Sequence, residues 1–238
     1  MMNTFQTNEK VHTLKRVLLV EDDADLSLIA TQHLQANQCL VDAAFSCAQA
    51  LEWLQKHTYD LILLDEMLPD MNGSELCATI RAQCTCPIIF LSCCSDSDSI
   101  ITALKNGGDD YMVKPINYKE LMARAEAIAR RFHEDAPEAD HLRTFRSFAI
   151  DTIHRNIIRE GTVINLTPIE YSLLEYLVDR PNVLLLYREL YEQVWSCDSL
   201  GDVRTISVHI SNLRKKLDPH HAGLISTVRG VGYIFSDI

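Results

Sequence analysis

The feature that most constrains the fold is a regular alternation of short apolar runs with amphipathic segments over residues 15–131. This pattern predicts a strand followed by a helix, five times over. Strands are expected at 16–20, 39–43, 60–64, 87–91 and 111–113, and helices at 24–35, 47–56, 74–82, 97–105 and 118–131. Apolar runs without alternation indicate strands that are covered on both faces. We therefore expect an α/β domain with a doubly wound, five-stranded parallel sheet, whose working site lies at the carboxyl ends of the strands.

A different pattern follows residues 132–143, an acidic stretch that contains Pro137 and lacks periodicity, as a linker does. Residues 148–164 alternate like short antiparallel strands. Thr167 to Glu170 form a capping box with Pro168 at the first helical position, which marks a helix start. Shorter helices at 188–195 and 203–217 and a hairpin at 225–235 complete an α+β domain over residues 144–238. Residues 1–14 are expected to be a flexible extension, and 15–131 the first domain.

The charge is uneven along the chain, whose net value is −11. The acidic total argues against a non-specific nucleic-acid binder. Residues 204–217 nevertheless hold four basic residues and no acid, which leaves room for a local contact with DNA. Because no apolar run approaches the roughly 18 residues of a membrane helix, and the N-terminal stretch lacks the features of a secretory signal, we expect a cytoplasmic protein without a membrane partner.

Eight cysteines raise the question of a metal or redox site. None of them forms a C-x-x-C motif. Cys86 and Cys93 flank an expected strand and should lie about 23 Å apart, so the thiols near them cannot share one zinc ion. We interpret the cysteines as small core residues, with a redox role as the alternative.

Polar residues stand where the expected parallel strands end. Glu21 and Asp22 follow the first strand, Asp65 the third, Ser92 the fourth and Lys114 the fifth. These ends meet at one edge of a parallel sheet, where three carboxylates would repel one another unless a hard cation joined them. Mg²⁺, or Mn²⁺ in its place, suits such a set. A nucleophilic carboxylate, a metal and a lysine are the parts needed to transfer a phosphoryl group to an aspartate.

Three motifs on this half of the chain, LLVEDD at 18–23, LLDEMLPDMNG at 63–73 and GDDYMVKP at 108–115, resemble the receiver domain of two-component response regulators. The resemblance implies that Asp65 accepts a phosphoryl group from the phosphohistidine of a sensor histidine kinase. It implies that the metal ligands are Glu21, Asp22, Asp65 and the carbonyl of Met67. It also implies that the phosphate and switch residues are Ser92, Tyr111 and Lys114, with a cis bond from Lys114 to Pro115. Ile116 and Cys93 depart from the residues usual in the family.

The second half resembles the winged-helix effector domain of the OmpR/PhoB family through TPIE at 167–170, the basic stretch at 204–217 and TVRGVGY at 227–233. The resemblance implies a bacterial transcriptional regulator that binds double-stranded promoter DNA and works with RNA polymerase. Phosphorylation is expected to promote a homodimer. The protein is not expected to be an enzyme, apart from Mg-dependent self-phosphorylation and slow autodephosphorylation at Asp65.

A helical projection of residues 203–217 separates a core face from a polar, basic face. Val203, Ile206, Ile210, Leu213 and Leu217 share the first face. A helix of this kind suits the major groove. The expected DNA contacts are Arg204, Thr205, Val208, His209, Ser211, Asn212, Arg214 and Lys215 on the helix, and Thr227 and Arg229 on the hairpin. His209, Arg214 and Lys215 are expected to meet phosphates, whereas Asn212 suits adenine.

The family resemblance also implies a dimer face of ion pairs on the fourth helix, fifth strand and fifth helix. The matching residues are Asp109, Asp110, Glu120 and Arg124. Residues 95–104 carry no basic residue, and Thr102 stands where relatives usually have arginine. Since exposed ion pairs contribute only ~0.2–1 kcal/mol each, we expect a dimer that is weaker and less sensitive to salt than in relatives with the full set.

Two other functions compete with this interpretation. A magnesium-dependent phosphatase with an aspartate nucleophile usually has a second carboxylate two residues later, where this chain has Met67. A regulator that senses redox state through cysteines would need a decayed acidic site, and here the acidic residues are intact. Incubation with acetyl phosphate and magnesium distinguishes the three functions. A response regulator gives a stable aspartyl phosphate, a phosphatase gives rapid turnover, and a redox regulator gives no reaction.

Overall fold

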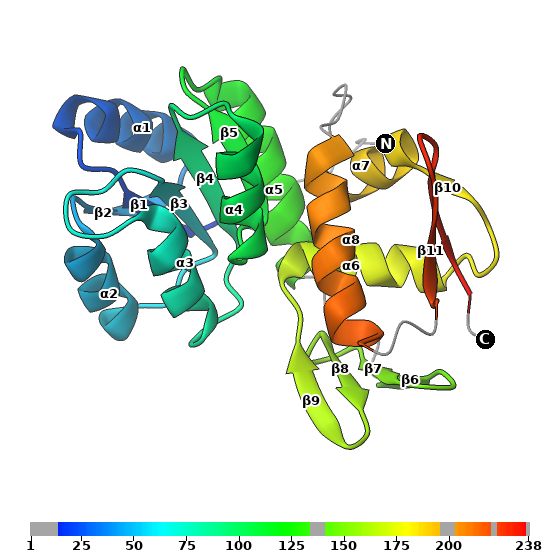
Figure 1. The fold of residues 1–238 in the computed structure, drawn as a ribbon. Coiled ribbons are helices and arrows are strands. Elements are labelled where there is room, and N and C mark those ends of the chain that lie inside the picture. Colours follow the sequence, from blue (N-terminus) through cyan, green and yellow to red (C-terminus); the bar gives the residue numbers. More distant parts are fainter. Residues whose placement is uncertain (1–13, 134–140, 196–202, 220–222, 237–238) are drawn as a thin grey trace, which may run out of the picture.

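A computed structural model describes residues 14–133, 141–195, 203–219 and 223–236. Residues 1–13 of the expected extension, 134–140 of the expected linker, and Cys197 lie outside the described residues. The chain forms two domains that lie side by side (Figure 1). We call the first the receiver half and the second the effector half. No helix among the described residues is long and apolar enough to cross a membrane.

The receiver half is the expected parallel sheet of five strands, in the order β2-β1-β3-β4-β5. Its strands are β1 (Arg16–Val20), β2 (Leu40–Ala44), β3 (Leu61–Asp65), β4 (Ile88–Ser92) and β5 (Asp110–Val113). Its helices are α1 (Ala24–Ala36), α2 (Cys47–Lys56), α3 (Gly73–Arg81), α4 (Ser97–Lys105) and α5 (Tyr118–His133). The predicted elements are confirmed, with bounds that differ from the expected ones by at most two residues.

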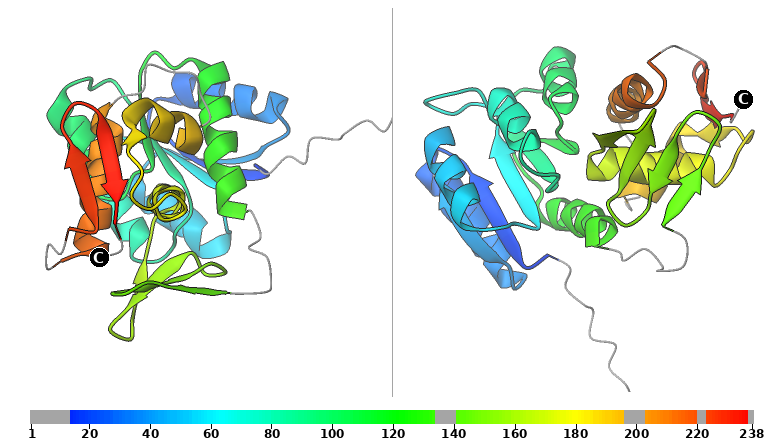
Figure 2. Two further views of the ribbon diagram at one scale, coloured as in Figure 1. Left: turned by 90° about the vertical axis from the view of Figure 1, so that its right-hand side faces the viewer. Right: turned by 90° about the horizontal axis from the view of Figure 1, so that it is seen from below.

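The sheet divides the receiver core into two layers, as the apolar runs predict. Val17 and Leu19 of β1 pack with α1 and α5, whereas Leu18 and Val20 pack with α2, α3 and α4 on the other face. All four side chains are fully buried. The two groups of helices can be followed on either side of the sheet in Figure 2. A strand buried on both faces cannot alternate in polarity, which explains the unbroken apolar runs.

Local signals place the helix starts and the loop after β3. Asp23, Ser46, Asn72 and Asp96 each cap a helix by accepting a hydrogen bond from a backbone N–H of the first turn. Gly73 begins α3 so close to the backbone carbonyl of Asp65 that no Cβ would fit there. The glycine therefore holds α3 tightly against the end of β3, where Asp65 lies.

The effector half contains two antiparallel sheets around three helices. One sheet has the order β6-β7-β8-β9 and the other β10-β12-β11. The strands are β6 (Leu142–Thr144), β7 (Ala149–Asp151), β8 (Asn156–Arg159), β9 (Thr162–Asn165), β10 (Leu185–Leu186), β11 (Ile225–Val228) and β12 (Gly232–Phe235). The helices are α6 (Pro168–Val178), α7 (Tyr187–Trp195) and α8 (Val203–Leu217). The capping box of Thr167 and Glu170 is confirmed.

Two details of the effector half differ from the sequence-based expectation. β6 begins at Leu142, inside the expected linker, because Leu142 pairs with Asp151 of β7. β6 is thereby the edge strand of this sheet. β10 was not expected, since two residues carry no periodicity; Leu185 acquires its strand geometry from pairing with Tyr233. In α8, Ile206, Ile210, Leu213 and Leu217 are buried as predicted, but Val203 is 44% exposed and does not belong to the core.

Candidate functional site

The carboxyl ends of β1 and β3 bring three acids together at one edge of the receiver sheet. Carboxylate oxygens of Glu21, Asp22 and Asp65 lie within 4.8 Å of one another. Glu21 and Asp65 are buried, while Asp22 is exposed, so the group opens to solvent on one side. Oxygen donors at this spacing fit a hard divalent cation. The amide of Met67 donates to Asp65 Oδ1 at 3.0 Å, which places the loop that follows β3 beside the same carboxylate.

Lys114 reaches this edge from the end of β5 and bridges two of the acids. Its Nζ lies 2.6 Å from Glu21 Oε2 and 2.5 Å from Asp65 Oδ2. The bond from Lys114 to Pro115 is cis. Burial, with the charge of Asp65 adding to it, raises the pKa of Glu21 to about 7 in spite of the lysine. One ammonium thus faces more carboxylate charge than it balances, and a divalent cation would relieve the excess.

Ser92 and Tyr111 both attach to the loop between β4 and α4. Ser92 is fully buried, and its Oγ accepts a hydrogen bond from the amide of Cys94 at 3.1 Å. The Tyr111 hydroxyl donates to the carbonyl of Cys94 at 2.7 Å, and its ring stacks on Phe90. Burial raises the pKa of Tyr111 to about 12. The two residues expected to act as a pair therefore hold the same loop, which leads directly into α4.

Glu66 is a buried acid that sequence reasoning missed. It directly follows Asp65, yet only 6% of it is exposed. Its Oε1 accepts a hydrogen bond of 2.5 Å from the Ser74 hydroxyl, and Oε2 has no partner among the described residues. Burial raises its pKa, and the charges of Asp65 and Asp96 add to the effect. The available signal was an acid placed next to a nucleophile at the end of an apolar strand.

The face of α8 that was expected to meet DNA packs against the receiver half instead. Arg204 donates to Ser97 Oγ at 2.6 Å, and Asn212 Nδ2 donates to the Leu104 carbonyl at 3.2 Å, so both bind α4. Val208 is buried in the receiver core cluster that includes Leu104. Thr205 and His209 are also buried, and Ser211 is half-buried. Most of this face is therefore covered in this conformation, by α4 and by the residues around Asp109, and its DNA contacts stay a prediction for a conformation in which the halves have separated.

The remaining expected DNA contacts stay near solvent. Lys215, Thr227 and Arg229 are exposed. Arg214 donates to the carbonyl of Ile225 and, at 2.7 Å, to Thr227 Oγ1, so it braces the β11–β12 hairpin rather than extending freely toward a phosphate. The hairpin therefore remains available in a conformation in which most of the helix face does not.

The residues of the expected dimer face are paired within the chain, and two of its acids, Asp109 and Asp110, are buried. Asp109 Oδ2 lies 2.6 Å from Arg81 Nη2, and Asp110 Oδ2 lies 2.8 Å from Arg124 Nη1. Arg124 also pairs with Glu120 at 2.7 Å. Asp109 and Asp110 are at most 1% exposed. The effector half lies over this face in this conformation, so the dimer face stays a prediction for a conformation in which the halves have separated.

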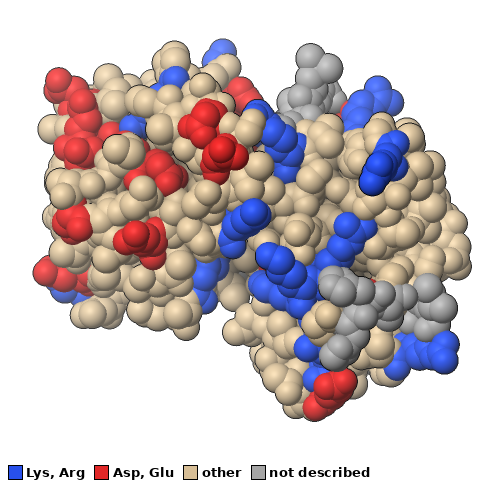
Figure 3. Space-filling view, viewed as in Figure 1, with Lys and Arg blue, Asp and Glu red and all other residues tan. Residues whose placement is uncertain are grey.

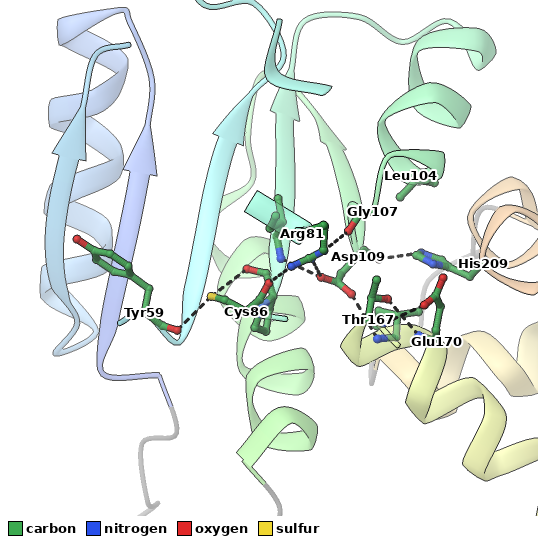
Figure 4. Close-up of polar contacts among 12 residues, drawn as sticks. Tyr59, Arg81, Cys86, Leu104, Gly107, Asp109, Thr167, Glu170 and His209 are labelled. Atoms are coloured by element: carbon green, nitrogen blue, oxygen red, sulfur yellow. Dashed lines mark hydrogen bonds and ion pairs between the residues drawn. The ribbon is translucent and has the colours of Figure 1, made fainter. Parts of the chain in front are cut away.

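Contacts between the halves explain that cover (Figure 4). The amide of Ile169 in α6 donates to Asp109 Oδ1 at 3.3 Å, and His209 Nε2 lies 3.1 Å from the Asp109 carbonyl oxygen. Arg124 Nη1 donates to the Tyr191 hydroxyl of α7 at 2.5 Å. We call this junction of α4, β5 and α5 with α6, α7 and α8 the interdomain seam. Sequence reasoning missed Arg81 and Tyr191, for which no motif gave a signal.

Charge is distributed unequally over the two halves. On the face shown in Figure 3, acidic side chains gather over the receiver half, and basic side chains lie along the seam and over the effector half. A cavity of about 300 Å³ at the seam is lined by Arg81, Lys105, Lys215 and Lys216, and Glu170 is the one acid among the described residues that line it. Opposite charges on the two halves favour their association.

Both halves match known families. Residues 17–126 match the family described as "Response regulator receiver domain", and residues 161–235 match the family described as "Transcriptional regulatory protein, C terminal".

Similar proteins extend over nearly the full chain. The "DNA-binding response regulator MtrA" of Mycolicibacterium paratuberculosis is 36% identical over 221 residues, which cover 92% of this chain and 97% of that protein. The "Transcriptional regulatory protein ResD" of Bacillus subtilis is 34% identical and covers 97% of both. Among solved structures, that of a point mutant of RitR has a TM-score of 0.75 at 32% identity, covering 94% of this chain and 100% of that one.

Proposed function

The chain belongs to the OmpR/PhoB type of DNA-binding response regulators, and from this membership we propose that phosphorylation of Asp65 opens the interdomain seam. The phosphoryl donor is the phosphohistidine of a sensor histidine kinase. Opening frees α8 for promoter DNA and the α4–β5–α5 face for a second copy. The DNA-bound dimer then works with RNA polymerase in the cytoplasm.

The observation that carries the chemistry is the position of Lys114 between Glu21 and Asp65. A carboxylate oxygen of Asp65 attacks the phosphorus while the bond from phosphorus to the donor nitrogen breaks, and an acyl phosphate forms. Lys114 then turns from carboxylate oxygens to the new phosphoryl oxygens. Glu21, Asp22, Asp65 and the carbonyl of Met67 would hold Mg²⁺, or Mn²⁺, which neutralises charge on the phosphoryl oxygens.

The proposed relay runs through the loop after β4. Ser92 lies at the end of β4 and holds Cys94, and Cys94 in turn holds the Tyr111 hydroxyl. Ser97, at the start of α4, accepts the hydrogen bond from Arg204 of α8. A phosphoryl group that draws Ser92 toward Asp65 would move this loop, and with it the first turn of α4. The hydrogen bond of Arg204 is the contact that this movement would break.

The proposal gives the receiver half no substrate other than its own phosphoryl group. Met67 stands where a phosphatase would place its second carboxylate, and its side chain is 63% exposed. Slow loss of phosphate from Asp65 then resets the closed form. In the open form, Arg124 is freed from Tyr191 and reaches acids of a second copy while it keeps Asp110, and the dimer is expected to be weak because residues 95–104 contribute no cation.

The test measures the mass of the full chain after incubation with acetyl phosphate and Mg²⁺. We expect one added phosphoryl group, together with binding to a selected promoter fragment in a footprinting titration. Asp65→Asn should take up no phosphate and keep its fold, because the amide is nearly isosteric but cannot form the acyl phosphate. Asp98→Asn, which alters an exposed acid of α4, should behave like the wild type. Phosphate uptake by Asp65→Asn at the wild-type level would refute the assignment.

A further inference from the structure

We propose that His209 makes the interdomain seam sensitive to protons, so that mild acid opens the closed form without phosphorylation. The proposal rests on the opening described above, but it involves neither Asp65 nor a phosphoryl donor. Its basis is the position of one imidazole, which lies in the recognition helix α8 and is sealed against the receiver half.

The imidazole of His209 is enclosed on all sides. Only 1% of the residue is exposed. Its ring lies 5.8 Å from that of Trp195, a fully buried residue of α7, and Nε2 lies 3.1 Å from the carbonyl oxygen of Asp109 beside β5. Figure 4 shows the ring pointing from α8 toward Asp109. Both halves of the protein therefore form the walls of this site, and the site exists only while they are in contact.

The hydrogen-bond pattern determines the protonation state of the ring. A carbonyl oxygen can only accept, so Nε2 carries the proton and donates it to Asp109. Nδ1 is then the unprotonated nitrogen, and it has no hydrogen-bond partner among the described residues. A proton added at Nδ1 would place a full positive charge in a buried site where no described residue offers that nitrogen an acceptor.

The charged groups around the ring add to this penalty. Arg81 of α3 and Lys216 of α8 both act on His209 with a repulsive positive charge. The carboxylates that accompany them are already occupied, because Asp109 pairs with Arg81 and Glu170 of α6 pairs with Lys216 at 2.6 Å. From α4, Lys105 lines the adjoining cavity together with Lys215. A protonated imidazole would therefore meet a surplus of cations from three helices.

The direction of the pH effect follows from the difference between the pKa of His209 in the closed form and its pKa in the open form. Burial, followed by the charges of Arg81 and Lys216, lowers the pKa of His209 from 6.5 to about 4 in the closed form. Once the seam opens, the imidazole regains water and titrates near its ordinary value of ~6.5. Contact between the halves is thus fully favourable above pH ~6.5 and weakens as the pH falls toward ~4. Between pH ~7.5 and ~5.5 the ratio of open to closed molecules should rise about tenfold.

Two neighbouring acids, Asp109 and Asp110, oppose the effect of His209, because their protonation favours the closed form. Burial raises the pKa of both Asp109 and Asp110, so that acid favours the covered state of their side chains. Their ion pairs with Arg81 and Arg124 lie within the receiver half and persist when the seam opens. Their pKa values therefore change less between the two states than that of His209, which loses all its enclosing contacts.

The test is an NMR titration of the full unphosphorylated chain from pH ~7.5 to ~5.0. It follows the imidazole signals of His209, assigned by their loss in His209→Gln, and the backbone amide of Ile169, which marks the seam. We expect His209 to titrate below pH ~6.5, and the Ile169 signal to move in the same transition. His209→Gln keeps a donor for the Asp109 carbonyl but cannot take up a proton, so its Ile169 signal should stay fixed. His154→Gln changes an exposed histidine and should titrate like the wild type.

Two results of the titration would overturn the proposal. A His209 that titrates at ~6.5 while the Ile169 signal stays fixed is not enclosed by the seam. An equal movement of the Ile169 signal in His209→Gln assigns the acid response to another group. Beryllofluoride with Mg²⁺ at pH ~7.5, a mimic of the phosphoryl group, supplies the separate check on phosphorylation. If beryllofluoride leaves the Ile169 signal unchanged while acid moves it, the proposed phosphorylation control fails and the role of His209 stands.

Discussion

The carboxylate edge and the interdomain seam handle negative charge in opposite ways. At the edge, Glu21, Asp22 and Asp65 lie together, Lys114 pairs with Glu21 and Asp65, and the group opens to solvent through Asp22. At the seam, Asp109 and Asp110 are buried, and each has its own arginine. An unbalanced, accessible cluster is suited to binding a hard cation, whereas the charges of the buried pairs are already neutralised within the receiver half. Under the proposed function, the edge is the part that changes state and the seam is the part that responds.

The largest effect should come from removing a cation at the seam. Arg81→Ala leaves Asp109 fully buried without its ion pair, and breaking one partner of such a pair costs about 3–5 kcal/mol. We expect a loss of that size in the free energy of unfolding from a urea titration of the full chain. Arg16→Ala removes an arginine from Asp42 at 2.8 Å in a more exposed pair, so it should cost far less. Equal losses in the two variants would contradict the contrast between buried and exposed pairs.

A smaller loss is expected at the edge, and Mg²⁺ should reverse it. Lys114→Ala leaves Glu21 and Asp65 without their cation, but Glu21 already has a pKa of about 7 and can take up a proton. The expected cost is therefore roughly 1–3 kcal/mol, below that at Arg81. Because a ligand that binds only the folded state stabilises it, Mg²⁺ should raise the urea midpoint of Lys114→Ala more than that of the wild type. Mg²⁺ should not restore Arg81→Ala. If Mg²⁺ left the urea midpoint of Lys114→Ala unchanged, the contrast between the carboxylate edge and the interdomain seam would be wrong.

The smallest effect concerns the seam alone. Tyr191→Phe removes the acceptor of the Arg124 hydrogen bond across the seam, while Arg124 keeps Asp110 and Glu120. The loss of one such bond is worth about 1 kcal/mol, or roughly fivefold in the open fraction. The affinity of the unphosphorylated chain for a promoter fragment should rise by that factor, since it scales with the open fraction. Tyr176→Phe removes a hydrogen bond to Glu189 within the effector half and should leave the affinity unchanged.

Local sequence patterns were sufficient to predict the receiver fold and the carboxylate edge. Apolar runs such as 61–64 predict strands covered on both faces, and the parallel order brings Glu21, Asp65 and Lys114 to one edge whatever the surroundings are. The core stripe of α8 was predicted for the same reason. It is confirmed except at its first residue, Val203, which was predicted to lie in the core and is exposed. These features depend on local periodicity and on strand ends, both of which a single chain displays directly.

Tertiary packing alone establishes what covers the polar face of α8 and the acids of β5. The helical projection placed His209 and Asn212 toward DNA, and the family resemblance placed Asp109 toward a second copy. They are buried or half-buried because each half supplies hydrogen-bond partners for polar groups of the other. Asn212 donates to the carbonyl of Leu104, and His209 donates to the carbonyl of Asp109. Contacts between residues about a hundred positions apart leave no trace in local periodicity. Under the proposed function, His209 and Asn212 would also suit DNA in the open form, and the closed form is the one in which the two halves satisfy these polar groups.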